Sequence, residues 1–97
     1  MLNMDLPSYI DTTKMVAIRL IPNALIGYNP KIEDVTGYAI RAISDHGSFH
    51  SEGNQHIKIL YPKDYSLSQI REIAECLANS LNVIFDDRTI NLVKHRN

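Results

Sequence analysis

The sequence predicts an α+β fold of the ferredoxin-like or a related type, in which two helices cover one face of an antiparallel sheet of four to six short strands. Three observations predict it: one segment with strong helical periodicity, a second helix-like segment, and short apolar runs rich in β-branched residues. Their order along the chain is strand, helix, hairpin, helix, strand, as in a split βαβ unit. The length of 97 residues predicts a single domain, 1–97.

Residues 66–82 give the firmest helical signal. Ser66 and Gln69 form the Ser-x-x-Gln pattern of a capping box, and Asn82 can adopt the left-handed conformation that ends a helix. Apolar residues recur between them at helical spacing, so one face of this helix needs a flat surface to cover. These residues are Leu67, Ile70, Ile73, Ala74, Leu77, Ala78 and Leu81.

The first third of the chain is expected to be extended. Residues 1–13 are expected to form a lead-in segment that is mobile except where Leu6 and the Tyr9-Ile10 pair pack onto the core. Residues 14–21 form an apolar, β-branched run, which predicts a strand. A turn signal follows it, and residues 24–28 are then either a second strand or an apolar loop.

Residues 30–45 are expected to form the second helix. Asn29 is a favourable N-cap and Pro30 suits the first helical turn, where its missing N–H costs nothing. The competing interpretation makes residues 35–43 a strand, and Gly37 favours it because glycine is unfavourable inside a helix.

Two hairpins complete the expected fold. Residues 48–61 predict a hairpin that turns at 52–54, so that His50 would face His56 across the two strands. Residues 83–85 and 89–94 predict a closing hairpin whose tip contains Asp86, Asp87 and Arg88.

Composition limits the classes of function. The formal charge is −1, from 10 basic and 11 acidic residues, which argues against direct binding of nucleic acid through phosphate neutralisation. One cysteine permits no intrachain disulfide bond. No apolar run approaches the roughly 20 residues needed to cross a bilayer, and the N-terminus lacks the order of a signal peptide. We therefore expect a cytoplasmic protein without a membrane partner; the sequence does not indicate its oligomeric state.

No motif for a cofactor, a metal or covalent catalysis is present, so we expect a non-enzymatic protein that needs no cofactor and no metal. One alternative is a metal-independent ribonuclease, in which His50 and His56 act as general acid and base. A second is a small nucleic-acid-binding module, although the segment 55–61 offers only Tyr61 for base stacking. Cys76 falls nearly opposite the apolar stripe of its helix and is expected to be an unreactive thiol.

The acidic residues suggest a contact surface. On the expected helix 30–45 the acids lie opposite the apolar stripe, with Gly37 among them, where a partner's backbone can approach closely. If these acids converge with those of the second helix and of the tip at 86–88, they form an acidic surface that complements a basic groove. The expected partner-binding residues are Glu33, Asp34, Gly37, Arg41, Asp45, Glu72, Glu75, Asp86 and Asp87.

In its size and its build as one small domain, the chain resembles the small inhibitors that phages and mobile elements encode, including anti-CRISPR proteins. This resemblance implies an inhibitor that occludes a nucleic-acid groove by steric blocking or charge mimicry. The partner would then be a protein or ribonucleoprotein complex of a host defence system.

Overall fold

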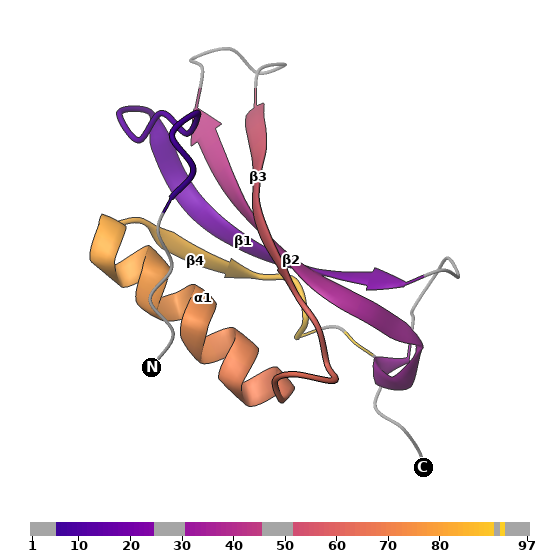
Figure 1. Cartoon of the computed structure of the whole chain (residues 1–97). Helices are drawn as coiled ribbons and strands as arrows, with labels where there is room; N and C mark the ends of the chain where they lie inside the picture. Colours follow the sequence, from indigo (N-terminus) through magenta and orange to yellow (C-terminus); the bar gives the residue numbers. More distant parts are fainter. Residues whose placement is uncertain (1–5, 25–30, 46–51, 91, 93–97) are drawn as a thin grey trace.

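A computed structural model of the chain describes residues 6–24, 31–45, 52–90 and 92. Its centre is a four-stranded sheet in the order β3-β2-β1-β4, strongly curved along the two long strands (Figure 1). One α-helix, α1, crosses one face of this sheet. The elements are β1 (Met15–Ala24), the 3-10 turn η1 (Ile32–Asp34), β2 (Val35–Asp45), β3 (Glu52–Leu60), α1 (Leu67–Leu81) and β4 (Ile84–Asp87).

Helix α1 confirms the sequence prediction for residues 66–82. The Ser66 hydroxyl accepts from the Gln69 backbone N–H at 3.2 Å, and the Gln69 side chain accepts from the Ser66 backbone N–H at 2.8 Å, which completes the capping box. Asn82 ends the helix in the left-handed conformation, with φ 58° and ψ 45°. Within the described residues, α1 is too short and too polar to cross a membrane, and no other helix there could do so.

The hydrophobic core lies between α1 and the sheet. Ile18 and Leu20 of β1, Ile40 of β2 and Ile70 of α1 are completely buried in it. The lead-in contributes in part as predicted, since Leu6 and Ile10 pack against this core, whereas Tyr9 is exposed. The remaining buried members of the cluster are Met15, Val35, Tyr38, Ala42, Ile57, Leu60, Ala74, Leu77 and Ala78.

The expected helix 30–45 is wrong, because residues 35–45 form strand β2 at the centre of the sheet. β2 pairs with β1 on one side and β3 on the other, and side chains on both of its faces are buried. A strand buried on both faces is apolar almost throughout, so its sequence loses the alternation that identifies a strand. The competing strand interpretation of 35–43 is the correct one.

The expected hairpin turn at residues 52–54 is also wrong. These residues open strand β3, with Glu52 opposite Asp45, Gly53 opposite Ser44 and Asn54 beyond them. The return from β2 to β3 falls within 46–51, outside the described residues.

The expected closing hairpin with its tip at residues 86–88 is also wrong, because residues 84–87 form strand β4. Asp86 and Asp87 are strand residues rather than a tip, and β4 runs parallel to β1, with Ile84 beside Ala17 and Asp87 beside Leu20. The turn comes later, at residues 88–90. The predicted antiparallel sheet with two helices is therefore wrong: the sheet is mixed, and α1 is the only α-helix in the described part of the chain. The α+β class agrees with the prediction, and the four strands of the described sheet fall at the lower end of the four to six expected.

Candidate functional site

The face of the sheet turned away from α1, called here the outer face, carries a row of polar side chains that crosses all four strands. In the register of the sheet, Asp86 of β4 lies beside Arg19 of β1, Arg19 lies opposite Arg41 of β2, and Arg41 lies opposite His56 of β3. Their neighbours along β1 and β2 belong to the core beneath α1, and because side chains alternate along a strand, these four point the other way. We call these four residues the polar row.

Hydrogen bonds hold three of the four residues of the polar row, namely Asp86, Arg19 and Arg41. Arg19 Nε donates to Asp86 Oδ2 at 2.7 Å, and Arg88 Nε donates to Asp86 Oδ1 at 2.9 Å. Toward the other end, Arg41 Nε donates to Asn54 Oδ1 of β3. The Arg19 side chain is only 14% exposed and that of Asp86 26%, so this pair is less screened by water than an ordinary surface ion pair. The row therefore presents its charges at defined positions.

The two arginines lower the pKa of Asp86 below its ordinary value of 3.8. The hydrogen bond from Arg88 is the largest cause, partial burial acts in the opposite direction, and the hydrogen bond from Arg19 adds to the lowering. The folded state therefore binds the Asp86 proton more weakly than the unfolded state, and the carboxylate stabilises the fold above the unfolded pKa.

We expect this stabilisation to be lost as the pH falls below the ordinary carboxyl value and through the lowered pKa of Asp86. Asp86→Asn should be less stable than the original chain at neutral pH and should lose less stability on acidification. Chemical denaturation at a series of pH values measures both, with Asp64→Asn as an exposed control. If Asp86→Asn and the original chain lost the same unfolding free energy on acidification, the acid-sensitive stabilisation could not be assigned to Asp86.

Apolar side chains flank the polar row on both sides of the outer face. Ile84 of β4 is 69% exposed, and Tyr61, directly after β3, is 44% exposed. Exposed aromatic and aliphatic side chains beside arginines are typical of the contact surfaces of proteins. The flanking positions are Ile84, Ala17 and Ile43 on one side of the row, and Ile21, Ala39 and Ile59 on the other. Of these six, Ile84 is exposed, Ile21 and Ile59 are half-buried, and Ala17, Ala39 and Ile43 are buried.

Gly37 belongs to this face, but it is not the open contact point that the sequence suggested. It is buried on β2, and a Cβ added there would lie 3.0 Å from Ile59 Cγ2 and 3.5 Å from two ring atoms of Tyr61. The glycine thus makes room for two side chains of its own chain. The space beside Gly37 is thus occupied by Ile59 and Tyr61 and is not open to a partner's backbone.

The neighbouring aspartate, Asp87, points to the opposite side of the sheet. Its Oδ1 accepts from the Thr89 backbone N–H at 2.8 Å and from Thr89 Oγ1 at 2.5 Å, and its Oδ2 lies 3.1 Å from Arg71 Nε of α1. Arg71 Nε also donates to Thr89 Oγ1 at 2.9 Å. Asp86 therefore joins β4 to β1, whereas Asp87 joins it to α1.

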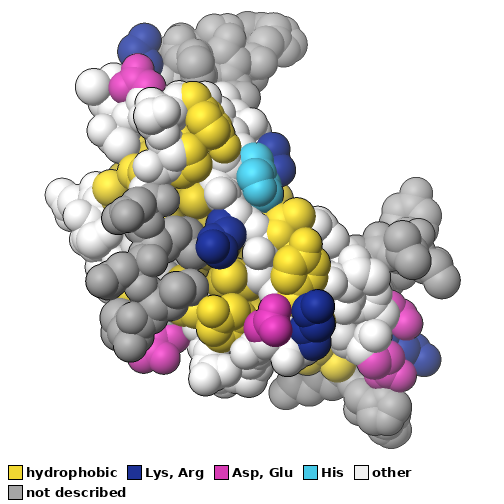
Figure 2. Space-filling model, viewed as in Figure 1, with side chains coloured by type: hydrophobic (Ala, Val, Ile, Leu, Met, Phe, Trp, Pro, Cys, Tyr) yellow, Lys and Arg dark blue, Asp and Glu magenta, His cyan; other side chains and the backbone are white. Residues whose placement is uncertain are grey.

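The acidic residues expected to bind a partner are not gathered in one place. Glu33 and Asp34 lie in η1, and Asp45 lies at the other end of β2, about 30 Å away for a strand of this length. Glu72 and Glu75 are exposed on α1, and Asp86 and Asp87 are engaged by arginines. Figure 2 shows acidic side chains in separate places over the face in view, interspersed with basic and apolar ones.

In the described sheet the cross-strand neighbour of His56 is Arg41, whereas the predicted pair placed His50 opposite His56. His46, His50 and His95 lie outside the described residues. Cys76 is half-buried on α1, and the described residues contain no group of three histidine, cysteine or acidic side chains that could hold a metal.

Sequence reasoning missed Arg19 and Ile84 as members of the outer face, and it named Tyr61 only as a residue for base stacking. One signal was available, since Arg19 is the single charged residue inside the apolar run 15–21. A charge in such a strand requires a partner on one face of the sheet. The partner, Asp86, was hidden because it lies 67 positions away in the chain.

Comparison of the chain with protein-family models, with curated proteins and with solved structures finds no match. The arrangement of the outer face is therefore the basis for a functional proposal.

Proposed function

We propose that this protein acts by binding a protein partner, without catalysing a reaction, and that the outer face of the sheet is its contact surface. The observation that carries the proposal is the pair of exposed apolar anchors, Ile84 and Tyr61, on either side of the polar row. Burying such side chains in a complex removes apolar area from water, and a few central anchors supply most of the affinity of a protein interface.

The polar row favours a protein over a nucleic acid as the occupant of this face. Asp86 places a carboxylate between Arg19 and Arg88 at the β4 end of the row, so the outer face is not a continuous basic surface for a phosphate backbone. Arg41 and His56 at the other end offer donors to a carboxylate or carbonyl group of a protein. Mixed signs at fixed positions set the register of a protein complex more than its strength.

The partner class that we propose is a nucleic-acid-binding complex of a host defence system, which a small phage-type inhibitor of this size would occlude in the cytoplasm. In this arrangement the outer face docks on protein, and the exposed acids of η1 and α1 are left to mimic phosphate charge. Asp86 and Asp87 are no longer proposed as free acidic contacts, because arginines of the same chain engage both.

The test compares two isoleucines of nearly equal exposure. Ile84, at 69% exposed, lies on the outer face, whereas Ile90, at 71%, lies beyond the end of β4 and outside the paired strands. Tagged protein is used to capture partners from a bacterial lysate treated with nuclease, and the affinity for the captured complex is then measured. We expect Ile84→Asp to weaken binding about 30-fold or more, and Ile90→Asp to leave it nearly unchanged.

Three results would contradict the proposal. Equal binding by Ile84→Asp and the original chain would exclude the outer face as the contact surface. Capture that disappears after nuclease treatment would indicate a nucleic-acid-binding module instead. Cleavage of a mixed RNA pool in the presence of chelator, abolished by His56→Ala, would indicate a ribonuclease.

A further inference from the structure

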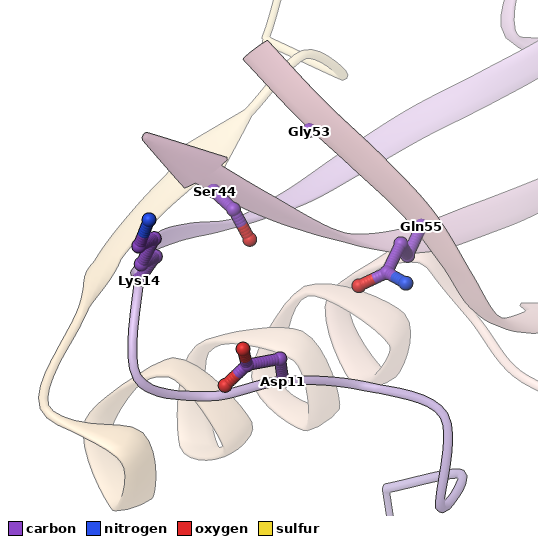
Figure 3. Close-up of a pocket in the computed structure, with 5 residues that line it drawn as sticks. All are labelled: Asp11, Lys14, Ser44, Gly53 and Gln55. Carbon is purple, nitrogen blue, oxygen red and sulfur yellow. The ribbon is translucent and has the colours of Figure 1, made fainter. Parts of the chain in front are cut away.

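A cavity of about 250 Å³ opens between the lead-in segment and the ends of β2 and β3, apart from the outer face (Figure 3). Since one water molecule occupies about 30 Å³ of liquid, this volume corresponds to about eight waters or to a small organic molecule. It is lined by Asp11, Lys14, Ser44, Gly53 and Gln55. These residues come from three segments that are far apart in the sequence, and four of them carry polar side chains.

Ser44 is the residue that indicates a ligand. It is only 7% exposed, and its hydroxyl has no hydrogen-bond partner among the described residues. A buried hydroxyl without a partner destabilises a fold, so native proteins rarely retain one without a reason. Figure 3 shows the Ser44 hydroxyl directed into the space above Asp11, where a bound molecule would satisfy it.

The other polar groups of the cavity are held in place by their neighbours. Asp11 Oδ1 accepts from Thr13 N at 2.9 Å and from Thr13 Oγ1 at 2.7 Å, which fixes the carboxylate of the lead-in. Gln55 Nε2 is directed to the Tyr9 carbonyl oxygen at 3.4 Å, so the amide oxygen is the atom of Gln55 that faces the cavity (Figure 3). Oxygen atoms of three side chains thus surround one part of the cavity.

Lys14 adds a positive charge at the edge of the cavity. Its carbonyl oxygen accepts from the Asp45 backbone N–H at 2.9 Å, which ties the lead-in to the end of β2. Its side chain stands at the rim, with the ammonium group turned away from Asp11 (Figure 3). The cavity therefore has oxygen acceptors on its inner side and a cation at its edge.

We propose that this cavity binds a small zwitterion of the amino-acid type. Its ammonium group donates to Asp11, Ser44 and Gln55, because three N–H donors match three oxygen acceptors. Its carboxylate meets Lys14 at the rim. The site is independent of the outer face, so ligand binding and partner binding are separate activities of the chain.

The test uses amide correlation spectra of the full chain, titrated with free amino acids including β-alanine and γ-aminobutyrate. Ethylamine and butyrate serve as matched probes that carry only one of the two charges. We expect saturable shifts at residues 11–14, 44 and 53–55 with at least one amino acid at or below about 10 mM, and binding at least about tenfold weaker for both single-charge probes.

Three variants identify the groups that bind. Asp11→Asn, Ser44→Ala and Lys14→Gln should each weaken amino-acid binding about tenfold, whereas Asp64→Asn, which is exposed, should not change it. Ser44→Ala removes a hydroxyl that has no described partner, so this variant should fold at least as well as the original chain, and its spectrum verifies this. The proposal is overturned if no amino acid produces saturable shifts, if ethylamine binds as tightly as the amino acids, or if the folded Ser44→Ala variant binds unchanged.

Discussion

Replacing Tyr38 by alanine should lower the free energy of unfolding by about 3–5 kcal/mol. Tyr38 is 2% exposed and is the largest fully buried side chain among the described residues. It lies in the middle of the sheet, opposite Pro22 of β1 and Leu60 of β3. Removing its ring loses the transfer free energy of the buried atoms and leaves a cavity that a β-sheet centre cannot close. For a chain of this size, the melting temperature should fall by roughly 15–30 °C.

The ring, and not the hydroxyl group, is expected to carry this effect. The Tyr38 hydroxyl has no hydrogen-bond partner among the described residues, and burial raises the pKa of the phenol, an effect that the charge of Arg71 partly offsets. Tyr38→Phe should therefore change stability by less than about 1 kcal/mol. Tyr61→Ala is the matched control, since the same ring is removed from an exposed position. Equal losses for Tyr38→Ala and Tyr61→Ala in urea denaturation would contradict the expectation.

Replacing Asp87 by alanine should destabilise the chain by about 2–3 kcal/mol. Thr89 is 1% exposed, and its backbone N–H would lose its acceptor in a place where water cannot replace it. Arg71 would at the same time lose the carboxylate that joins α1 to β4. A buried donor left without a partner costs more than the net contribution of the hydrogen bond itself.

Asp87→Asn separates the hydrogen bond from the charge. The amide oxygen still accepts from Thr89, so this variant should lose about 1 kcal/mol, mainly through the weaker contact with Arg71. Asp64→Ala should have almost no effect, because Asp64 is exposed in the turn before α1. Thermal or urea denaturation measures all three. A loss below about 0.5 kcal/mol in Asp87→Ala would show that Thr89 has another way to satisfy its N–H.

Helix α1 and strand β1 could be predicted because local chemistry determines them. The Ser66–Gln69 capping box and the left-handed Asn82 are interactions between residues a few positions apart, and both form as the sequence indicates. The apolar run at 14–21 likewise became β1, although the strand continues past Pro22 to Ala24. Pro22 lies in the strand rather than in a turn, where its fixed φ is also compatible with extended backbone.

Strand β2 could not be predicted with the same certainty, because its pattern depends on burial that arises only in the folded sheet. Side chains on both faces of β2 are buried. The apolar residues of the segment 35–44 therefore do not alternate as in a half-exposed strand, and their spacing also fits a helix. Gly37 was the local clue, and its reason is steric: Ile59 and Tyr61 occupy the space beside it. The turn signal at Gly53-Asn54 was overridden by pairing with β2.

The polar row was the least predictable part of the candidate site. Arg19, Arg41 and His56 are unremarkable in the sequence, and only the sheet register places them side by side with Asp86. The two aspartates of β4 suggested an exposed hairpin tip because adjacent acids are usually solvated. Their arginine partners lie on β1 and α1, and no spacing rule connects such distant positions.

The short strand β4 also has a consequence for the folding kinetics of the chain. β1, β2 and β3 pair with their neighbours in sequence, but β4 reaches β1 only after the whole hairpin region and α1 have been passed, and the Arg19–Asp86 contact closes a loop of 67 positions. Closing so long a loop has a high entropic cost, so this pairing should form late. Until it does, one edge of β1 presents unpaired backbone groups to any other chain. Refolding at high concentration should therefore lose material to association, and stronger docking of α1 and β4 should reduce that loss.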